Sequence, residues 1–490
     1  PVDRDQLIKL NHEHLLKILS HYDKHNDYDR RGIRSSGVIG GRESLEADLN
    51  AATSLVPMHF LPLVGEIEAA ELSKSYIYSI INGITTHLSV RFDNVTSSGW
   101  QEVEPLPEGE KLARSLLDLV ERYCNDDERG YSTPRAIKAC GSVLNDDNSL
   151  DRMCFQLWRL GMHSSPELSK DDDANGLVEH GINSTRGVAA ETVVKICNRR
   201  LELGYPLTTD LVQLLHRYAS DPSMVVRATF LMGLPYLHSK EDQLGWDLIG
   251  KLRDGAKPRL IKHFERSMYY QYHSHFEAVR PFLELMENNE DESTCEAWGR
   301  LATLSFLDGH IDEESLWQAT EDRHESCLTG MGQVFVENLG SNKSSVICIE
   351  GLAKLFSSNA PKEVFSDFEH SLEHKEWASS IPFALIEIYL GEAPFDNISE
   401  LHGLFAWLEK HVHENPNEIL ILLESLLTRL QDQSERMHFY RPEALVATLN
   451  MLLQDADLSD EEEYINRVLV IQDWFLDHGL KELEEMYDAA

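Results

Sequence analysis

Three residues of this chain, His370, Glu373 and His374, form an H-x-x-E-H pattern whose types and spacing could do chemistry. On a helix, the two imidazoles can bind zinc and the glutamate can act as a general base. However, a chain with 22 histidines can contain this pattern by chance, and the neighbouring Glu369 and residues 375–376 are typical of a solvated helix face. We therefore expect no metal, no cofactor and no enzymatic activity. A metallohydrolase that uses the pattern is the alternative.

Other motifs of catalysis and ligand binding do not match. Gly37, Gly40 and Gly41 lack the lysine and the preceding strand of a P-loop. Residues 27–32 begin like a calcium loop, but Arg31 stands where an oxygen ligand is needed. The seven cysteines are odd in number, widely spaced and without a CxxC pair, which is typical of reduced thiols in the core of a cytoplasmic protein.

Length and charge exclude several classes of protein. The 490 residues carry 45 Lys and Arg against 83 Asp and Glu, and the difference, 45 − 83, is a formal net charge of −38. A strongly acidic surface repels phosphate, so the chain is not expected to bind nucleic acid non-specifically or to bind an anionic membrane. No apolar stretch approaches the roughly 18 to 20 residues that span a bilayer. Since the sequence starts at Pro1 without a signal-like segment, we expect a part of a larger polypeptide.

The elements that must position any site are helices. Apolar residues recur at helical spacing in segments of roughly 12 to 18 residues, separated by short polar breaks, and almost no strand pattern is present. Two stripes of this kind, three hundred residues apart, consist of Leu112, Leu116, Leu119, Val120 and Tyr123, and of Ile419, Leu423, Leu426, Leu427 and Leu430. The sequence therefore predicts an all-α fold.

Breaks in the helical pattern divide the chain into four expected parts. These are an N-terminal helical segment over residues 1–92, a linker or irregular insert over 93–109, a HEAT-like solenoid over 110–390 and acidic C-terminal helical repeats over 391–490. The insert lacks helical period and contains two prolines. The acidic runs at 460–463 and 482–485 are interpreted as solvated helix faces.

A weak internal repeat places an acid and an arginine at helix starts. Asp221 stands six residues before Arg227, Asp146 stands six residues before Arg152, and Arg186 occupies the same place in a third segment. Spacings in the 30s and 40s are typical of two-helix repeats and predict an α-solenoid of HEAT- or TPR-like antiparallel helix pairs. We expect each aspartate to cap a helix and each arginine to bind neighbouring turns, which is a structural role.

A basic and aromatic segment stands out in this acidic chain. Residues 251–266 carry six basic side chains against two acidic ones, and tyrosines follow. The segment consists of Lys251, Arg253, Lys257, Arg259, Lys262, Arg266, Tyr269, Tyr270 and Tyr272. This composition is typical of the centre of a protein interface. The alternative is intramolecular: the bases neutralise neighbouring acidic helices and the tyrosines pack between them.

Residues 181–191 (GINSTRGVAAE), followed by the 221–227 segment, resemble the helical C-terminal regions of large bacterial STAND-type NTPases, in particular the AVAST group of antiviral defence proteins. The likeness covers roughly residues 110–310. Further similar segments are 264–270, 279–286 and 297–301.

The resemblance implies a sensor. In that family, an effector and an ATP-binding module precede a helical region that recognises a viral protein, such as the terminase large subunit or the portal. Because the ATP-binding motif is absent here, the resemblance implies that this chain is the sensor part alone. A helical-repeat scaffold or adaptor that is unrelated to an NTPase is the other interpretation, and in both the partner is a protein.

Overall fold

The computed structural model describes residues 3–23, 32–34, 37–39, 41–93, 95–103, 106–124, 132–167, 176–320, 324–358, 360–394, 398–430, 439, 442–458 and 462–480. Most of the calcium-like segment (27–31), Gly40, half of the first acidic run (460–461) and all of the second (482–485) lie outside these residues.

The fold is all-α, as the periodicity predicts, and the chain divides into two compact units, Pro1–Tyr270 and Gln271–Ala490. The expected boundaries near residues 92, 109 and 390 fall inside these units. The division at 270 falls within the basic and aromatic segment, so Tyr272 belongs to the second unit and its other members to the first.

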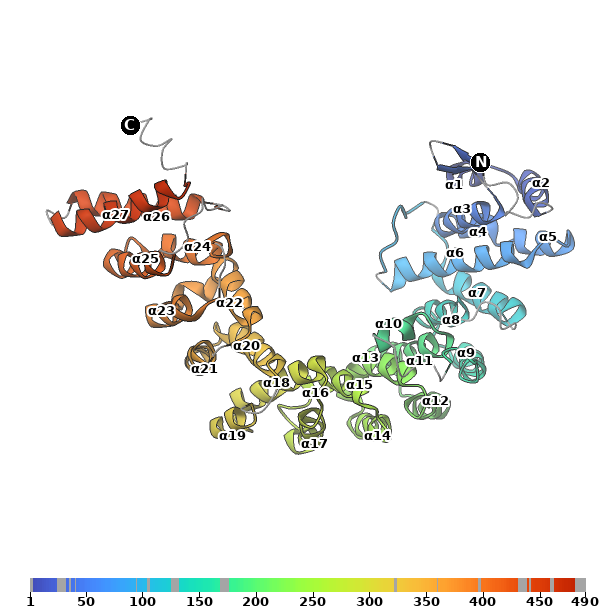
Figure 1. The fold of residues 1–490 in the computed structure, drawn as a ribbon. Helices are drawn as coiled ribbons and strands as arrows, with labels where there is room; N and C mark the ends of the chain where they lie inside the picture. The colour runs from blue at the N-terminus through green and yellow to red at the C-terminus, as the bar shows by residue number, and fades with distance from the viewer. Residues whose placement is uncertain are drawn as a thin grey trace. The chain divides into compact units, whose positions relative to one another are not determined.

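The first unit contains one small hairpin and a series of helices (Figure 1). The hairpin pairs β1 (Gly32–Arg34) with β2 (Gly37–Ile39) in antiparallel register. The helices are α1 (Arg4–Leu7), α2 (His12–Asp23), α3 (Arg42–Leu55), α4 (Pro57–Phe60), α5 (Leu63–Ala69), α6 (Lys74–Phe92), α7 (Gly109–Tyr123), α8 (Ser132–Gly141), α9 (Asp147–Leu160), α10 (Leu177–Ile182), α11 (Thr185–Glu202), α12 (Thr209–Ala219), α13 (Met224–Lys240), α14 (Asp242–Arg253), α15 (Pro258–Ile261), η4 (Lys262–Phe264) and α16 (Glu265–Tyr269).

Two layers of helices make up the main part of the first unit. In one layer α6, α8, α11, α13 and α16 pack in succession, and in the other α7, α9, α12 and α14 do so. Consecutive helices also pack against each other across the layers, so each pair buries its apolar stripe against the next pair. Between α6 and α7 the described residues form no helix or strand, and Trp100 fixes this stretch by donating to the Ser54 carbonyl at 2.9 Å.

The second unit repeats the two-layer plan. Its helices are α17 (Phe276–Glu287), α18 (Glu292–Leu307), α19 (Glu313–Gln318), α20 (Ser326–Asn338), α21 (Ser345–Ser357), α22 (Lys362–His374), η5 (Glu376–Ser380), α23 (Phe383–Glu392), η6 (Ile398–Glu400), α24 (His402–His411), α25 (Pro416–Leu430), α26 (Glu443–Leu458) and α27 (Glu462–Asp477). One layer contains α18, α20, α22, α24 and α26, and the other contains α21, α23, α25 and α27. Each unit is therefore an α-solenoid.

The apolar stripes form the core of both units. All five residues of the C-terminal stripe are buried on α25, and in the α7 stripe only Leu119 is partly exposed. All seven cysteines are free thiols and six of them are buried. No helix among the described residues is long and apolar enough to cross a membrane.

Candidate functional site

A buried ion pair joins two successive turns of the first unit. Asp221 lies between α12 and α13, and its Oδ2 is 3.2 Å from Nε of Arg186 on α11. Asp221 Oδ1 also accepts the backbone N–H of Ser223 at 2.9 Å. Burial raises the pKa of Asp221, while the N–H of Ser223 and the charge of Arg186 oppose this shift. Arg186 thus contacts the carboxylate of a neighbouring turn, whereas Asp221 does not cap α13, whose N-cap residue is Ser223.

Arg227 extends this network toward the basic segment. Its Nε donates to the Asp221 carbonyl at 2.7 Å, and its Nη1 donates to the carbonyls of Leu252 and Asp254 at 3.2 and 2.8 Å. Burial lowers the pKa of Arg227. Because these two carbonyls lie at the C-terminal end of α14, Arg227 fixes the position from which the basic segment starts.

Asp146 and Arg152 lie in the other layer. Asp146 caps α9 through the N–H of Ser149 at 3.0 Å. Arg152 donates to both carboxylate oxygens of Glu121 at 2.9 and 2.6 Å and to Asp118 on α7. The repeat alignment therefore equates α9 with α11 and α13, although these helices belong to different layers. An acid before a helix followed by an arginine has the same spacing in either layer, so the sequence could not separate them.

The basic surface of the first unit is exposed except at Lys262, which is partly buried. We define it as Lys251, Arg259, Lys262 and Arg266 together with Tyr269 and Tyr270. It extends from the last turn of α14 through α15 and η4 to the end of α16. These four cations form no ion pair with any residue that the structure describes. Arg253 and Lys257 are also exposed, and Tyr272 is partly buried in the second unit.

The two tyrosines are exposed as well. Tyr269 is 50% exposed and Tyr270 57%, and their rings are nearly perpendicular with centroids 5.2 Å apart. They are thus not packed between helices. Exposed aromatic rings beside unpaired cations form a surface that a partner with acidic and apolar groups can cover.

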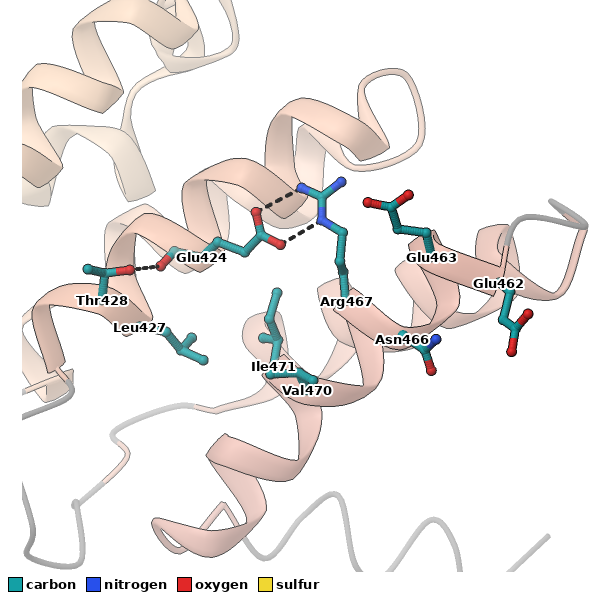
Figure 2. A pocket seen from close by; sticks show the side chains of 9 residues that line it. All are labelled: Glu424, Leu427, Thr428, Glu462, Glu463, Asn466, Arg467, Val470 and Ile471. Carbon is teal, nitrogen blue, oxygen red and sulfur yellow. Dashed lines mark hydrogen bonds and ion pairs between the residues drawn. The ribbon is translucent and has the colours of Figure 1, made fainter.

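A groove lies between α25 and α27 in the second unit (Figure 2). Its volume is about 730 Å³, and the residues that line it are Glu424, Leu427, Thr428, Glu462, Glu463, Asn466, Arg467, Val470 and Ile471. Arg467 crosses the groove and donates to both carboxylate oxygens of Glu424 at 2.7 Å each. No sequence pattern predicts this site, because it forms between helices that lie more than thirty residues apart in the chain.

The H-x-x-E-H pattern lies on α22. Glu373 Oε2 is 3.3 Å from Nε2 of His374 and 3.2 Å from Nε2 of His402, so its carboxylate contacts imidazoles from α22 and α24. The rings of His370 and His374 lie 4.5 Å apart. No group of three or more His, Cys, Asp or Glu among the described residues is arranged to hold a metal ion.

The interpretation of Glu369 as part of a solvated face is wrong. Its carboxylate is buried and accepts three hydrogen bonds: from the N–H groups of Gly403 and Leu404 at 2.6 and 2.9 Å, and from the Tyr389 hydroxyl at 2.7 Å. The two N–H groups belong to the first turn of α24. A Cβ at Gly403 would lie 2.0 Å from the Glu369 carbonyl, so only glycine permits this approach of α22 and α24. Burial raises the pKa of Glu369 to about 7.

Comparison with protein-family models, curated proteins and solved structures finds no match for this chain.

Proposed function

We propose that this chain is a protein-binding α-solenoid, and that the basic surface of its first unit is a docking site for a partner with exposed acidic side chains. The observation that carries the proposal is that four cations, three of them exposed and Lys262 partly exposed, form no ion pair with a described residue. They lie beside two half-exposed tyrosines in a chain of net charge −38. The net negative charge of the chain disfavours an acidic partner over most of its surface, so the basic surface favours docking at this place.

The partner we propose is a viral protein. The resemblance of residues 181–191 and 221–227 to the sensor regions of antiviral STAND NTPases supports this choice, with the terminase large subunit and the portal as the two candidates. Arg186 and Arg227 belong to those segments, and both contact Asp221. Arg227 also donates to the Asp254 carbonyl at the end of α14, next to the basic surface. In this proposal the chain recognises the viral protein and a separate ATP-binding module responds.

The test is a binding titration of the purified chain with a purified terminase large subunit and with a purified portal protein. A variant with Arg259→Glu, Arg266→Glu and Tyr270→Ala reverses two of the four cations of the basic surface and removes one of its two tyrosines, all at exposed positions. We expect the affinity of this variant for the partner to be at least about tenfold lower, which corresponds to about 1.4 kcal/mol. The affinity of the unmodified chain should decrease as salt is added.

The matched control reverses the same amount of charge in the same unit. Lys9 and Lys111 are exposed and form no ion pair with a described residue, and Tyr205 is 50% exposed. Lys9→Glu, Lys111→Glu and Tyr205→Ala should leave affinity unchanged. An equal loss in both variants would contradict the assigned surface, and absence of binding to either viral protein would contradict the proposed partner.

A further inference from the structure

We propose that the groove between α25 and α27 binds a helical segment of a protein partner, with large apolar side chains at one end of that segment and Lys or Arg at the other. This site lies in the second unit and does not depend on the partner proposed for the basic surface.

The groove has a graded lining. Along α27 its residues fall in two rows with helical spacing: Glu463, Arg467 and Ile471 face α25, and Glu462, Asn466 and Val470 form the exposed row (Figure 2). The first and last members of a row are eight positions apart, which is about 12 Å along the helix. One end is therefore acidic and the other is apolar, where Ile471 and Leu427 form the floor and Val470 is 65% exposed.

The occupant is expected to be a helix. Both walls of the groove are helices. Their backbone N–H and C=O groups bond within each helix, so the walls offer side chains but no backbone partners to a bound segment. An extended segment would thus leave its own backbone groups without partners, whereas a helix satisfies them internally. A helix also places apolar side chains three and four residues apart on one stripe, which fits a groove of this kind.

Charge selects a basic occupant. Glu424 is neutralised by Arg467, but Glu462 and Glu463 form no ion pair with a described residue. The acidic end of the groove therefore carries two exposed carboxylates, which favours a segment with Lys or Arg at that end.

Charge also disfavours the most obvious occupant from this chain. Residues 481–490 follow Leu480 directly and lie outside the described residues, and their sequence carries one lysine against four acidic residues. Such a segment is repelled by Glu462 and Glu463. The basic partner helix is thus the occupant that fits.

The test uses the full chain and a fluorescent synthetic peptide of about 16 residues, which is long enough to form a helix on binding. The peptide carries leucines along one face and lysines at one end, and a second peptide has glutamates in place of the lysines. We expect saturable binding of the lysine peptide only. Glu462→Lys with Glu463→Lys, and separately Val470→Asn, should each weaken binding about tenfold.

Controls on the same helix separate the groove from general charge and hydrophobicity. Asp473 and Asp477 are exposed on α27 outside the groove, and Leu469 is an exposed apolar neighbour of Val470. Asp473→Lys with Asp477→Lys, and Leu469→Asn, should bind the lysine peptide as the unmodified chain does. Equal losses in groove and control variants would overturn the proposal, as would equal binding of the two peptides or no binding of either.

Two further measurements distinguish the other occupants. Deletion of residues 481–490 should leave peptide affinity unchanged, and a marked gain would show that this segment occupies the groove instead. Sedimentation of the unmodified chain and of the Glu462→Lys, Glu463→Lys variant should give the same mass. A lower mass for the variant would identify a second copy of the chain as the occupant and overturn the proposal.

Discussion

Asp221 in the first unit and Glu369 in the second are both buried carboxylates that join successive helix pairs, but they are held by different chemistry. Asp221 lies against the guanidinium of Arg186. Among the residues that the structure describes, Glu369 accepts hydrogen bonds only from neutral donors, namely two N–H groups at the start of α24 and the hydroxyl of Tyr389 on α23. The nearby charge that acts on it is that of Glu373, one turn along α22, and this charge further raises the pKa of Glu369.

The two carboxylates both join neighbouring helices, but their partners give them different ionisation states. A buried carboxylate beside a cation stays ionised, and removal of either partner leaves the other charged and without compensation. A buried carboxylate beside neutral donors has no such cation, so its pKa is raised and its protonated form is populated near neutral pH. Only the second carboxylate is therefore expected to make stability depend on pH near neutrality.

The largest expected effect comes from breaking the ion pair. Asp221→Ala leaves Arg186 buried and charged, and we expect it to destabilise the helices around it by about 3 to 5 kcal/mol. Because the chain contains two units, the appropriate measurement is hydrogen exchange at the amides of α11 and α13, which reports local opening. Asp210→Ala, at an exposed position of α12, is the control and should change the free energy of local opening by less than about 0.5 kcal/mol. Similar protection in the two variants would refute the assigned role of Asp221.

The second prediction concerns the pH dependence of Glu369. Its pKa is about 7 in the folded chain and about 4.3 when unfolded, so the folded state holds the proton more tightly. The stabilising contribution is then fully present below about pH 4.3 and is lost as pH rises through about 7. Glu369→Gln keeps an oxygen acceptor for Gly403 and Leu404 but does not titrate. Between about pH 4 and pH 8, the free energy of opening of this variant should therefore rise by up to about 3 kcal/mol relative to that of the unmodified chain.

Hydrogen exchange at the amides of α22 and α24, followed across this pH range, measures the effect once the intrinsic exchange rates are corrected. Glu363→Gln changes an exposed carboxylate at the start of the same helix and should reproduce the pH dependence of the unmodified chain. If Glu369→Gln also reproduces it, the proton is not bound at Glu369.

The fold could be predicted from the sequence because helical periodicity is a local property. The stripe from Ile419 to Leu430 falls on one helix and each of its members is buried, as the spacing requires. The hairpin over residues 32–39 escaped prediction because its strands have only three residues each, too few to show an alternating pattern.

The sites were less accessible to sequence reasoning, since they depend on which helices meet. The cations of residues 251–266 are visible as composition, but their exposure is not. The burial of Glu369 depends on Gly403, 34 residues further along the chain, which allows α24 to approach. The layer to which Arg152 belongs is likewise decided by packing rather than by its spacing from Asp146.

The smallest effect is expected at Arg152. It tests whether burial, rather than the presence of an ion pair, decides how much stability is lost when one partner is removed. The Arg152 side chain is 27% exposed, and its two acidic partners on α7, Glu121 and Asp118, are more exposed still. The hydrogen bonds to Glu121 and Asp118, together with the charges of these carboxylates, raise the pKa of Arg152, so it stays protonated at all accessible pH. Arg152→Ala should cost about 1 kcal/mol at low salt, and the cost should shrink as salt screens the pair, whereas the cost of Asp221→Ala should hardly change with salt. Exchange at the amides of α7 and α9 over a range of salt concentrations measures this. A loss as large as that of Asp221→Ala, and independent of salt, would mean that exposure does not separate the two ion pairs.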